Sequence, residues 1–201
     1  MLTKSDIVQV SNGMQQAHGN IWSLSSKDDA IVIPVNVGWR QRDNRAVMGR
    51  GLAFQASQRW PWLRDRWGQH CRQRGADAIP CVFYIESKWA RSVILFPSKP
   101  LNEEKPWLSW YGPSDLGLIK KHLPALSGLA TDPITIKGQP ILCGERILVP
   151  LIGCGNGNLD PVDIVPVLEQ GLTHERFVLV HPETRTEEES EGSEDGADRL
   201  P

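Results

Sequence analysis

The sequence has few cysteines, and no two of them form a close pair. The four copies are Cys71, Cys81, Cys143 and Cys154. A zinc site needs short paired spacings and a disulfide scaffold needs a dense set, so the cysteines support neither. We therefore expect reduced, mostly buried thiols in a cytoplasmic protein that holds no metal and no other cofactor.

The sequence also lacks targeting and membrane signals. Residues 1–6 contain no basic-then-apolar leader. No apolar run approaches the roughly 20 residues of a membrane-spanning helix, and no internal repeat is present. We expect a monomer that makes no membrane contact.

Acidic residues are concentrated at the C-terminal end. The 201 residues carry a formal net charge of -2. The stretch from Glu183 to Pro201 contains eight acidic residues and two arginines, which gives it -6 and leaves +4 for the rest. Residues 182–201 are poor in large apolar side chains, so we expect a disordered acidic tail whose simplest role is solubility. Residues 1–181 are enough for one domain, and their mild positive charge permits a phosphate-bearing partner.

Glycines and asparagines interrupt an apolar run near residue 150. The apolar segment 148–152 leads into the glycine-rich segment 153–159, and Asp160-Pro161 then opens a predicted helix. A strand, a glycine loop and a helix can build a phosphate cradle, because glycine lets the backbone approach an anion and the helix end is electropositive. The segment matches neither standard nucleotide motif, so an ordinary strand-to-helix loop remains the alternative.

Strand patterns alternate with helix patterns along the chain. The predicted strands are 7–10, 30–37, 82–85, 92–96, 147–152 and 177–181. The predicted helices run from 51 to 60, from 61 to 74, from 114 to 129 and from 161 to 170, and residues 131–145 form an excursion with three turn signals. Prolines predict a bulge or strand end at Pro34, a sharp strand end before Pro97 and an interruption at Pro124. The alternation predicts a three-layer α/β architecture.

Tryptophan is unusually frequent, with eight copies. Trp60, Trp62 and Trp67 fall on adjoining predicted helices, where we expect them to be buried. Trp107, Trp110 and Tyr111 lie in a loop rich in tryptophan and proline. Exposed rings in this loop would be able to stack on a base, and the alternative is that they pack the loop against the protein.

Several segments, taken in order, resemble a macro domain, the ADP-ribose-binding α/β/α module. These segments are Gly19-Asn20-Ile21, a buried strand ending in Asn36, Met48-Gly49-Arg50-Gly51-Leu52-Ala53, and Pro150-Leu151-Ile152-Gly153-Cys154-Gly155 with Leu159-Asp160 behind it. The resemblance extends over residues 5 to 181. It implies a three-layer fold with a mixed, mostly parallel central sheet, and ADP-ribose or an ADP-ribosylated macromolecule as the partner.

One branch of this family is the most similar. Met48-Gly49-Arg50-Gly51-Leu52-Ala53-Phe54-Gln55 and Phe96-Pro97-Ser98-Lys99 resemble the DNA ADP-ribosyl glycohydrolase antitoxin of the DarTG type and its relative, terminal ADP-ribose glycohydrolase. The resemblance implies that Lys99 is catalytic. The alternatives are a surface lysine at a strand end and a cation that contacts phosphate without making bonds.

The resemblance also implies roles for ligand-binding residues. Asn20 would accept a hydrogen bond from the adenine amino group, Ile21 would lie beside the ring, and Asn36 would contact the distal ribose. The residues that would wrap the diphosphate and distal ribose are Gly49, Arg50, Gly51, Leu52 and Ala53 on one side and Gly153, Cys154, Gly155, Asn156, Gly157 and Asn158 on the other.

Three features depart from the family pattern. Ile33 replaces the first asparagine of the usual pair, and Gly157 stands where terminal ADP-ribose glycohydrolase has a catalytic aspartate. The segment from Trp39 to Arg45 is longer than expected. Its arginines, with Arg50, favour an anionic partner, although a ligand diphosphate alone would explain them.

Other polar residues have plainer interpretations. We interpret Asp160 as a helix N-cap and Cys154 as a small loop residue. His18 and His181 are expected at a strand end or turn, not as an acid–base pair.

We therefore predict an ADP-ribosyl hydrolase that frees ADP-ribose from a nucleic acid base or an acidic side chain, with assistance from Lys99. A reader that binds ADP-ribose without cleaving it and a phosphatase of ADP-ribose 1″-phosphate are the alternatives. Single-stranded nucleic acid is a candidate partner.

Overall fold

The computed structural model describes residues 7–9, 13–85, 87–132, 134–136, 139–141 and 143–183. The predicted acidic tail lies outside these residues from position 184 onwards. Within the described part of the chain, no helix is both long enough and apolar enough to span a membrane.

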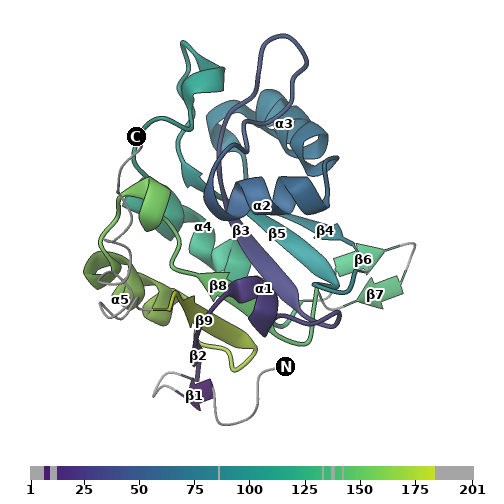
Figure 1. Cartoon of the computed structure of the whole chain (residues 1–201), viewed down its shortest axis with the longest axis vertical. Coiled ribbons are helices and arrows are strands. Elements are labelled where there is room, and N and C mark those ends of the chain that lie inside the picture. Colours follow the sequence, from purple (N-terminus) through teal and green to yellow (C-terminus); the bar gives the residue numbers. More distant parts are fainter. Residues whose placement is uncertain are drawn as a thin grey trace, which may run out of the picture.

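A seven-stranded sheet in the order β1-β2-β9-β8-β3-β5-β4 forms the centre of the molecule (Figure 1). Its strands are β1 (Ile7–Gln9), β2 (Gln15–His18), β3 (Ala30–Asn36), β4 (Cys81–Tyr84), β5 (Ser92–Lys99), β8 (Ile147–Pro150) and β9 (Phe177–His181). The five central strands run parallel, and the two edge strands β1 and β4 are antiparallel to their neighbours. The predicted mixed, mostly parallel sheet is confirmed.

Helices cover both faces of the sheet, which completes the predicted three-layer α/β/α fold. The helices α1 (Ile21–Leu24), α2 (Gly51–Arg59) and α3 (Leu63–Arg74) share one core cluster with inward residues of the sheet such as Ile31 and Ile33. The helices α4 (Leu116–Gly128) and α5 (Pro161–Gly171) share the other cluster with residues such as Val32. Figure 1 shows α1 and α2 in front of the sheet and α4 behind it. Alternate side chains of β3 pack into opposite core clusters, so both faces of the strand are buried. This explains why its sequence is continuously apolar.

Two strand-end predictions at prolines have different outcomes. β3 continues through Pro34 to Asn36, with the expected irregularity between Val35 and Asn36. The predicted end of β5 before Pro97 is wrong, because the strand continues to Lys99. Pro97 pairs with Val35 just before the register shifts, so the missing N–H falls where the ladder is already irregular.

The helices show further differences from the predictions. α4 passes through Pro124 without a break, so the predicted interruption is wrong. Pro124 is exposed, and the helix gives up one backbone hydrogen bond there. Trp60 and Trp67 are buried as predicted, but Trp62 is 39% exposed and packs edge-on against Phe83.

Short elements complete the structure. The pattern of the sequence did not predict β2 or the four-residue α1. The predicted excursion contains a separate hairpin of β6 (Ile134–Ile136) and β7 (Gln139–Ile141). In the described part of the chain, the 3-10 turns η2 (Gly75–Asp77), η3 (Pro106–Leu108) and η4 (Gly155–Gly157) lie in the loops.

Candidate functional site

The carboxyl ends of β3, β5 and β8 meet at one edge of the sheet. Asn36 ends β3, Lys99 ends β5, and Pro150 ends β8. Three segments leave this edge: the first glycine loop (residues 46–50), the tryptophan loop (residues 101–113) and the second glycine loop (residues 151–159). In parallel α/β sheets, ligands bind beyond this end of the strands.

Asn36 presents an unused acceptor at this edge. Its Nδ2 donates to Val47 O at 2.7 Å, and its backbone oxygen accepts the indole N–H of Trp67 at 2.8 Å. These bonds fix the orientation of a side chain that is only 9% exposed. Its Oδ1 has no hydrogen-bond partner. A buried carbonyl oxygen without a donor is costly, so the arrangement suits a ligand hydroxyl that completes it.

The first glycine loop leads into the open N-terminus of α2. Arg50 is the N-cap residue, and its side chain makes no capping hydrogen bond. Gly51 has φ +56°, a left-handed conformation that favours glycine. Leu52 and Ala53 follow in the first turn and are half-buried. The N–H groups of this turn and the helix dipole favour an anion.

The second glycine loop turns its carbonyl groups toward the protein. Gly157 O accepts from Ser114 N at 2.8 Å, and Gly155 O accepts from Asn158 N at 3.0 Å. Within the described chain, the N–H groups of Gly155 and Asn156 have no acceptor. Left-handed backbone at Gly153, Gly155 and Asn158 produces these turns. The loop therefore offers backbone N–H groups to a ligand.

The two glycine loops come into contact. A Cβ atom on Gly51 would lie 3.0 Å from Asn156 Nδ2, which is tighter than an ordinary packing contact. The Asn156 amide thus lies against the first residue of α2, and a side chain at Gly51 would displace this amide.

Ser114 explains why position 157 carries no side chain. A Cβ atom on Gly157 would overlap Ser114 Oγ and would lie 3.0 Å from Ser114 Cβ. Ser114 is 6% exposed and its Oγ has no hydrogen-bond partner. An aspartate at position 157 has no room in this arrangement. No pattern in the sequence indicated the Ser114–Gly157 contact.

Lys99 connects three chain segments. Its Nζ donates to Trp110 O at 3.0 Å, to Gly112 O at 2.7 Å and to Asn156 O at 2.7 Å. It therefore fastens the tryptophan loop to the second glycine loop. Burial and the nearby Arg50 guanidinium lower the pKa of Lys99 below its ordinary value. This residue combines a fixed position with an ammonium that loses its proton more readily than a surface lysine.

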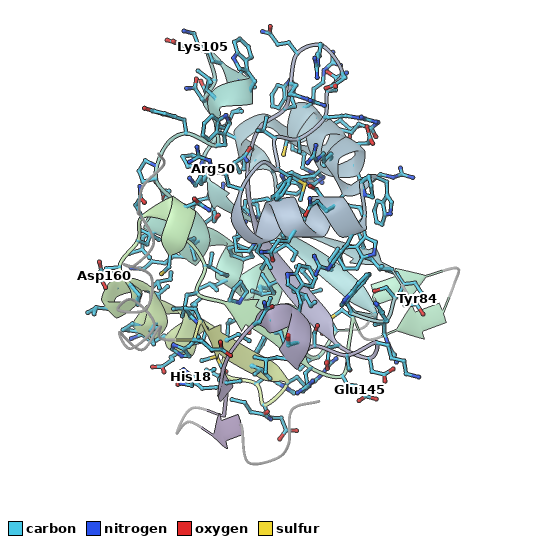
Figure 2. All side chains as sticks on the ribbon, in the orientation of Figure 1. His18, Arg50, Tyr84, Lys105, Glu145 and Asp160 are labelled. Carbon is cyan, nitrogen blue, oxygen red and sulfur yellow. The ribbon has the colours of Figure 1, made fainter. Side chains whose placement is uncertain are left out.

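Aromatic residues form a rim beside Lys99. The guanidinium of Arg50 lies 5.4 Å from the ring centroid of Trp110, and Trp110 packs edge-on against Tyr111 at 5.7 Å. Tyr111 is 79% exposed, whereas Trp107 is half-buried. Figure 2 shows Arg50 in the upper part of the molecule and Lys105 of the tryptophan loop above it, at the top. Of the predicted loop aromatics, Tyr111 is the one that is free to stack on a ligand.

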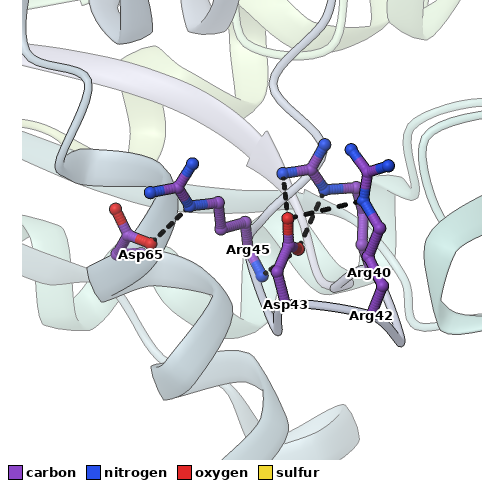
Figure 3. Close-up of polar contacts among 5 residues, drawn as sticks. All are labelled: Arg40, Arg42, Asp43, Arg45 and Asp65. Carbon is purple, nitrogen blue, oxygen red and sulfur yellow. Dashed lines mark hydrogen bonds and ion pairs between the residues drawn. The ribbon is translucent and has the colours of Figure 1, made fainter.

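The arginines between β3 and the first glycine loop are occupied by acidic partners (Figure 3). Arg40 makes a two-point contact with Asp43, at 3.1 and 2.6 Å, and Arg45 pairs with Asp65 at 2.6 Å. Arg42 is 77% exposed and lies 3.6 Å from the same Asp43. The four predicted arginines therefore do not form one free basic cluster. Three of them have an acidic partner, and of the four Arg50 alone lacks an ion pair within the described chain.

The region predicted for adenine lies at the ends of β2 and β9. Asn20 is exposed and caps α1, with its Oδ1 accepting Trp22 N at 3.0 Å, while Ile21 is buried. His18 and His181 are aligned on neighbouring strands and their rings stack 4.9 Å apart. The strand-end placement expected for these histidines is confirmed. The adenine contacts of Asn20 and Ile21 remain predictions.

Two plainer interpretations agree with the structure. Asp160 caps α5, since its Oδ1 accepts Val162 N at 2.9 Å. Burial raises the pKa of the Cys154 thiol, with Asp160 adding to the effect, which makes it a poor nucleophile. Among the described residues, no group of three or more His, Cys, Asp or Glu side chains is placed to hold a metal ion.

Comparison with known proteins gives structural matches only. No family model matches the chain, and no curated protein sequence matches it. The macrodomain of Thermus aquaticus DarG matches with a TM-score of 0.59 and 23% identity, over 83% of this chain and 95% of that chain. The macrodomain of Mycobacterium tuberculosis DarG matches with a TM-score of 0.58 and 23% identity, over 82% of this chain and 95% of that chain.

A further match is Thermosipho africanus DarTG in complex with ADP-ribose, with a TM-score of 0.62 and 19% identity. It covers 90% of this chain but only 45% of that longer chain. At identities this low, the structural matches show a shared fold and nothing more. The chain has the fold of a macrodomain, and DarG macrodomains are among the structures that it resembles.

Proposed function

We propose that this edge of the sheet binds ADP-ribose, with the diphosphate held between the two glycine loops. The observation that carries the proposal is the pairing of two sets of open backbone N–H groups, at the start of α2 and at Gly155–Asn156. Each set favours an anion, and Asn156 brings the two into contact. The Thermosipho africanus structure, which holds ADP-ribose, supports this ligand.

The distal ribose then lies between Asn36 and Lys99. The unpaired Oδ1 of Asn36 accepts a ribose hydroxyl, which satisfies a buried acceptor. β3 and β5 are neighbours, and Asn36 is aligned with Lys99 in their register. The anomeric carbon C1″, where the modification is attached, is thereby brought within reach of the amine.

We propose that Lys99 assists hydrolysis at C1″. In one route the neutral amine accepts a proton from the attacking water. In the other the amine attacks C1″ of the ring-opened sugar, the bond from C1″ to the carrier breaks and the carrier leaves with a proton; water then hydrolyses the resulting imine, which frees ADP-ribose and regenerates the amine. Both routes need an unprotonated amine, and the lowered pKa of Lys99 favours it.

A nucleic acid base is the carrier that the rim favours. Tyr111 is exposed beside Trp110 and Arg50, and a planar base stacks on such a ring. An ADP-ribosylated acidic side chain is the other carrier, and it would make little use of the exposed ring.

Activity assays on Lys99 variants test the proposal. ADP-ribosylated DNA and ADP-ribosylated protein are incubated with the natural chain, with Lys99→Ala and with the control Lys105→Ala. Lys105 is exposed, and its backbone N–H, not its amine, makes the local hydrogen bond to Asn102. We expect Lys99→Ala to lose activity by about 100-fold or more, and Lys105→Ala to keep it.

Equal release by the natural chain and Lys99→Ala, or no release by either, would contradict the hydrolytic role. Cyanoborohydride added during turnover distinguishes the two routes. A mass increase on the Lys99 peptide identifies the imine route.

A reader that binds ADP-ribose without cleaving it is the second candidate. Two observations favour it: the amine of Lys99 is engaged by three carbonyl groups, and Gly157 offers no acid. Calorimetry with ADP-ribose separates the cases, because binding without turnover supports the reader and no binding removes both functions.

A further inference from the structure

We propose that the acidic C-terminal segment of this chain is a partner of its own anion-binding edge and competes there with phosphate-bearing ligands. This inference rests on the anion-binding part of the proposed function and is independent of the hydrolytic step. It follows from where the last strand ends, from the charge at that edge and from the spacing of acidic residues in the sequence.

The last strand ends beside the second glycine loop. β9 is parallel to β8, and Val180 is aligned with Pro150, the last residue of β8. Neighbouring strands are about 4.8 Å apart, so His181 is about one strand spacing from the beginning of the second glycine loop. The chain therefore leaves the sheet at the edge that carries Asn36, Lys99 and the two glycine loops.

The edge presents positively polarised N–H groups and one arginine guanidinium. The start of α2 and the N–H groups of Gly155 and Asn156 provide partial positive charge. The side chain of Arg50 is exposed, lies against Trp110 and has no ion pair within the described chain. Carboxylates and phosphates are both ligands for such groups.

The acidic residues begin within reach of this edge. The segment from Glu183 to Pro201 carries -6. A run of three glutamates, Glu187-Glu188-Glu189, begins six residues after His181. Six residues span at most about 20 Å in any conformation, and two strand spacings between β9 and β3 amount to about 10 Å. The run can therefore meet the glycine loops, and its tether gives it a high effective concentration there.

Two matched variants of the full chain test the inference. The near variant replaces Glu187, Glu188 and Glu189 with glutamine. The far variant replaces Glu194, Asp195 and Asp198 with the corresponding amides. Each removes three negative charges, so a bulk effect of net charge is the same in both. Only the near variant removes the acidic run that a short stretch of chain connects to the end of β9.

Backbone amide resonances of the ligand-free protein measure the contact directly. At low salt, we expect the near variant to shift the resonances of Gly51, Leu52, Gly155 and Asn156 relative to the natural chain, and the far variant to shift them less. At 1 M salt the Debye length falls to about 3 Å, so the three spectra should coincide at these positions. Unshifted resonances in the near variant, or equal shifts in both variants, would overturn the inference.

Affinity for ADP-ribose gives the functional consequence. We expect the near variant to bind ADP-ribose about threefold more tightly than the natural chain at low salt, with the far variant close to the natural chain. If no variant binds ADP-ribose, the proposed function fails, while the amide resonances still decide whether the acidic run contacts the edge.

Discussion

Replacing Gly157 with alanine tests the packing that closes the second glycine loop. The new Cβ would overlap Ser114 Oγ and lie 3.0 Å from Ser114 Cβ, and Ser114 is held in place by its N–H bond to Gly157 O. Ser114 Oγ can rotate away about χ1, but Ser114 Cβ cannot, so the loop and the serine must move apart. Overpacking of this kind costs about 1–3 kcal/mol. In a domain of this size the cost corresponds to a Tm lower by roughly 2–12 °C, measured by thermal denaturation.

A double-mutant cycle identifies the cause. Ser114→Gly removes Oγ and Cβ, the two atoms that the new Cβ would crowd, so the combination of Gly157→Ala with Ser114→Gly should recover much of the loss. Gly49→Ala is the matched control, since a Cβ there would have no heavy atom within 4 Å. A Gly157→Ala protein as stable as the natural chain would refute the reasoning. Additive losses in the double variant would refute the assignment to Ser114.

Two further predictions concern pH and the aromatic rim. Burial lowers the pKa of His122 and of His181, with Lys121 and His18 adding respectively. The unfolded chain binds protons at these histidines more readily than the folded chain, so the free energy of unfolding should fall as pH drops below about 6.5. In thermal melts between pH 7.5 and 5.5, His122→Leu should weaken this pH dependence. A pH dependence as steep in His122→Leu as in the natural chain would contradict the prediction. Tyr111→Ala should leave Tm unchanged while weakening turnover of ADP-ribosylated DNA more than of ADP-ribosylated protein, and equal losses on both would remove the stacking role.

The sequence was most informative where one local pattern determines one element. β9 has the predicted bounds because Phe177–His181 is a continuous apolar run that ends in a polar residue. Asp160-Pro161 predicted the start of α5 because both residues act within a single turn. β2 was not predicted, since Gln15–His18 is short and mostly polar and is held by pairing with β9.

The candidate site was predictable in part. The glycine clusters and Asn36 could be identified because their order along the chain resembles that of macro domains. The three carbonyl partners of Lys99 could not be identified, because the acceptors are backbone atoms up to 57 residues away and leave no mark in residue type. The arginine pairings with Asp43 and Asp65 were missed for a similar reason, since charge counts do not show which side chains neutralise one another.

The three hydrogen bonds of Lys99 link its protonation state to the mobility of the site. An ammonium has three N–H donors, whereas a neutral amine has two. Loss of the proton therefore leaves one of Trp110 O, Gly112 O and Asn156 O without its donor. If the neutral amine is the reactive form, the step that activates it also loosens the join between the tryptophan loop and the second glycine loop. Loss of a single proton would then both activate the amine and allow the two loops to separate for release of the product.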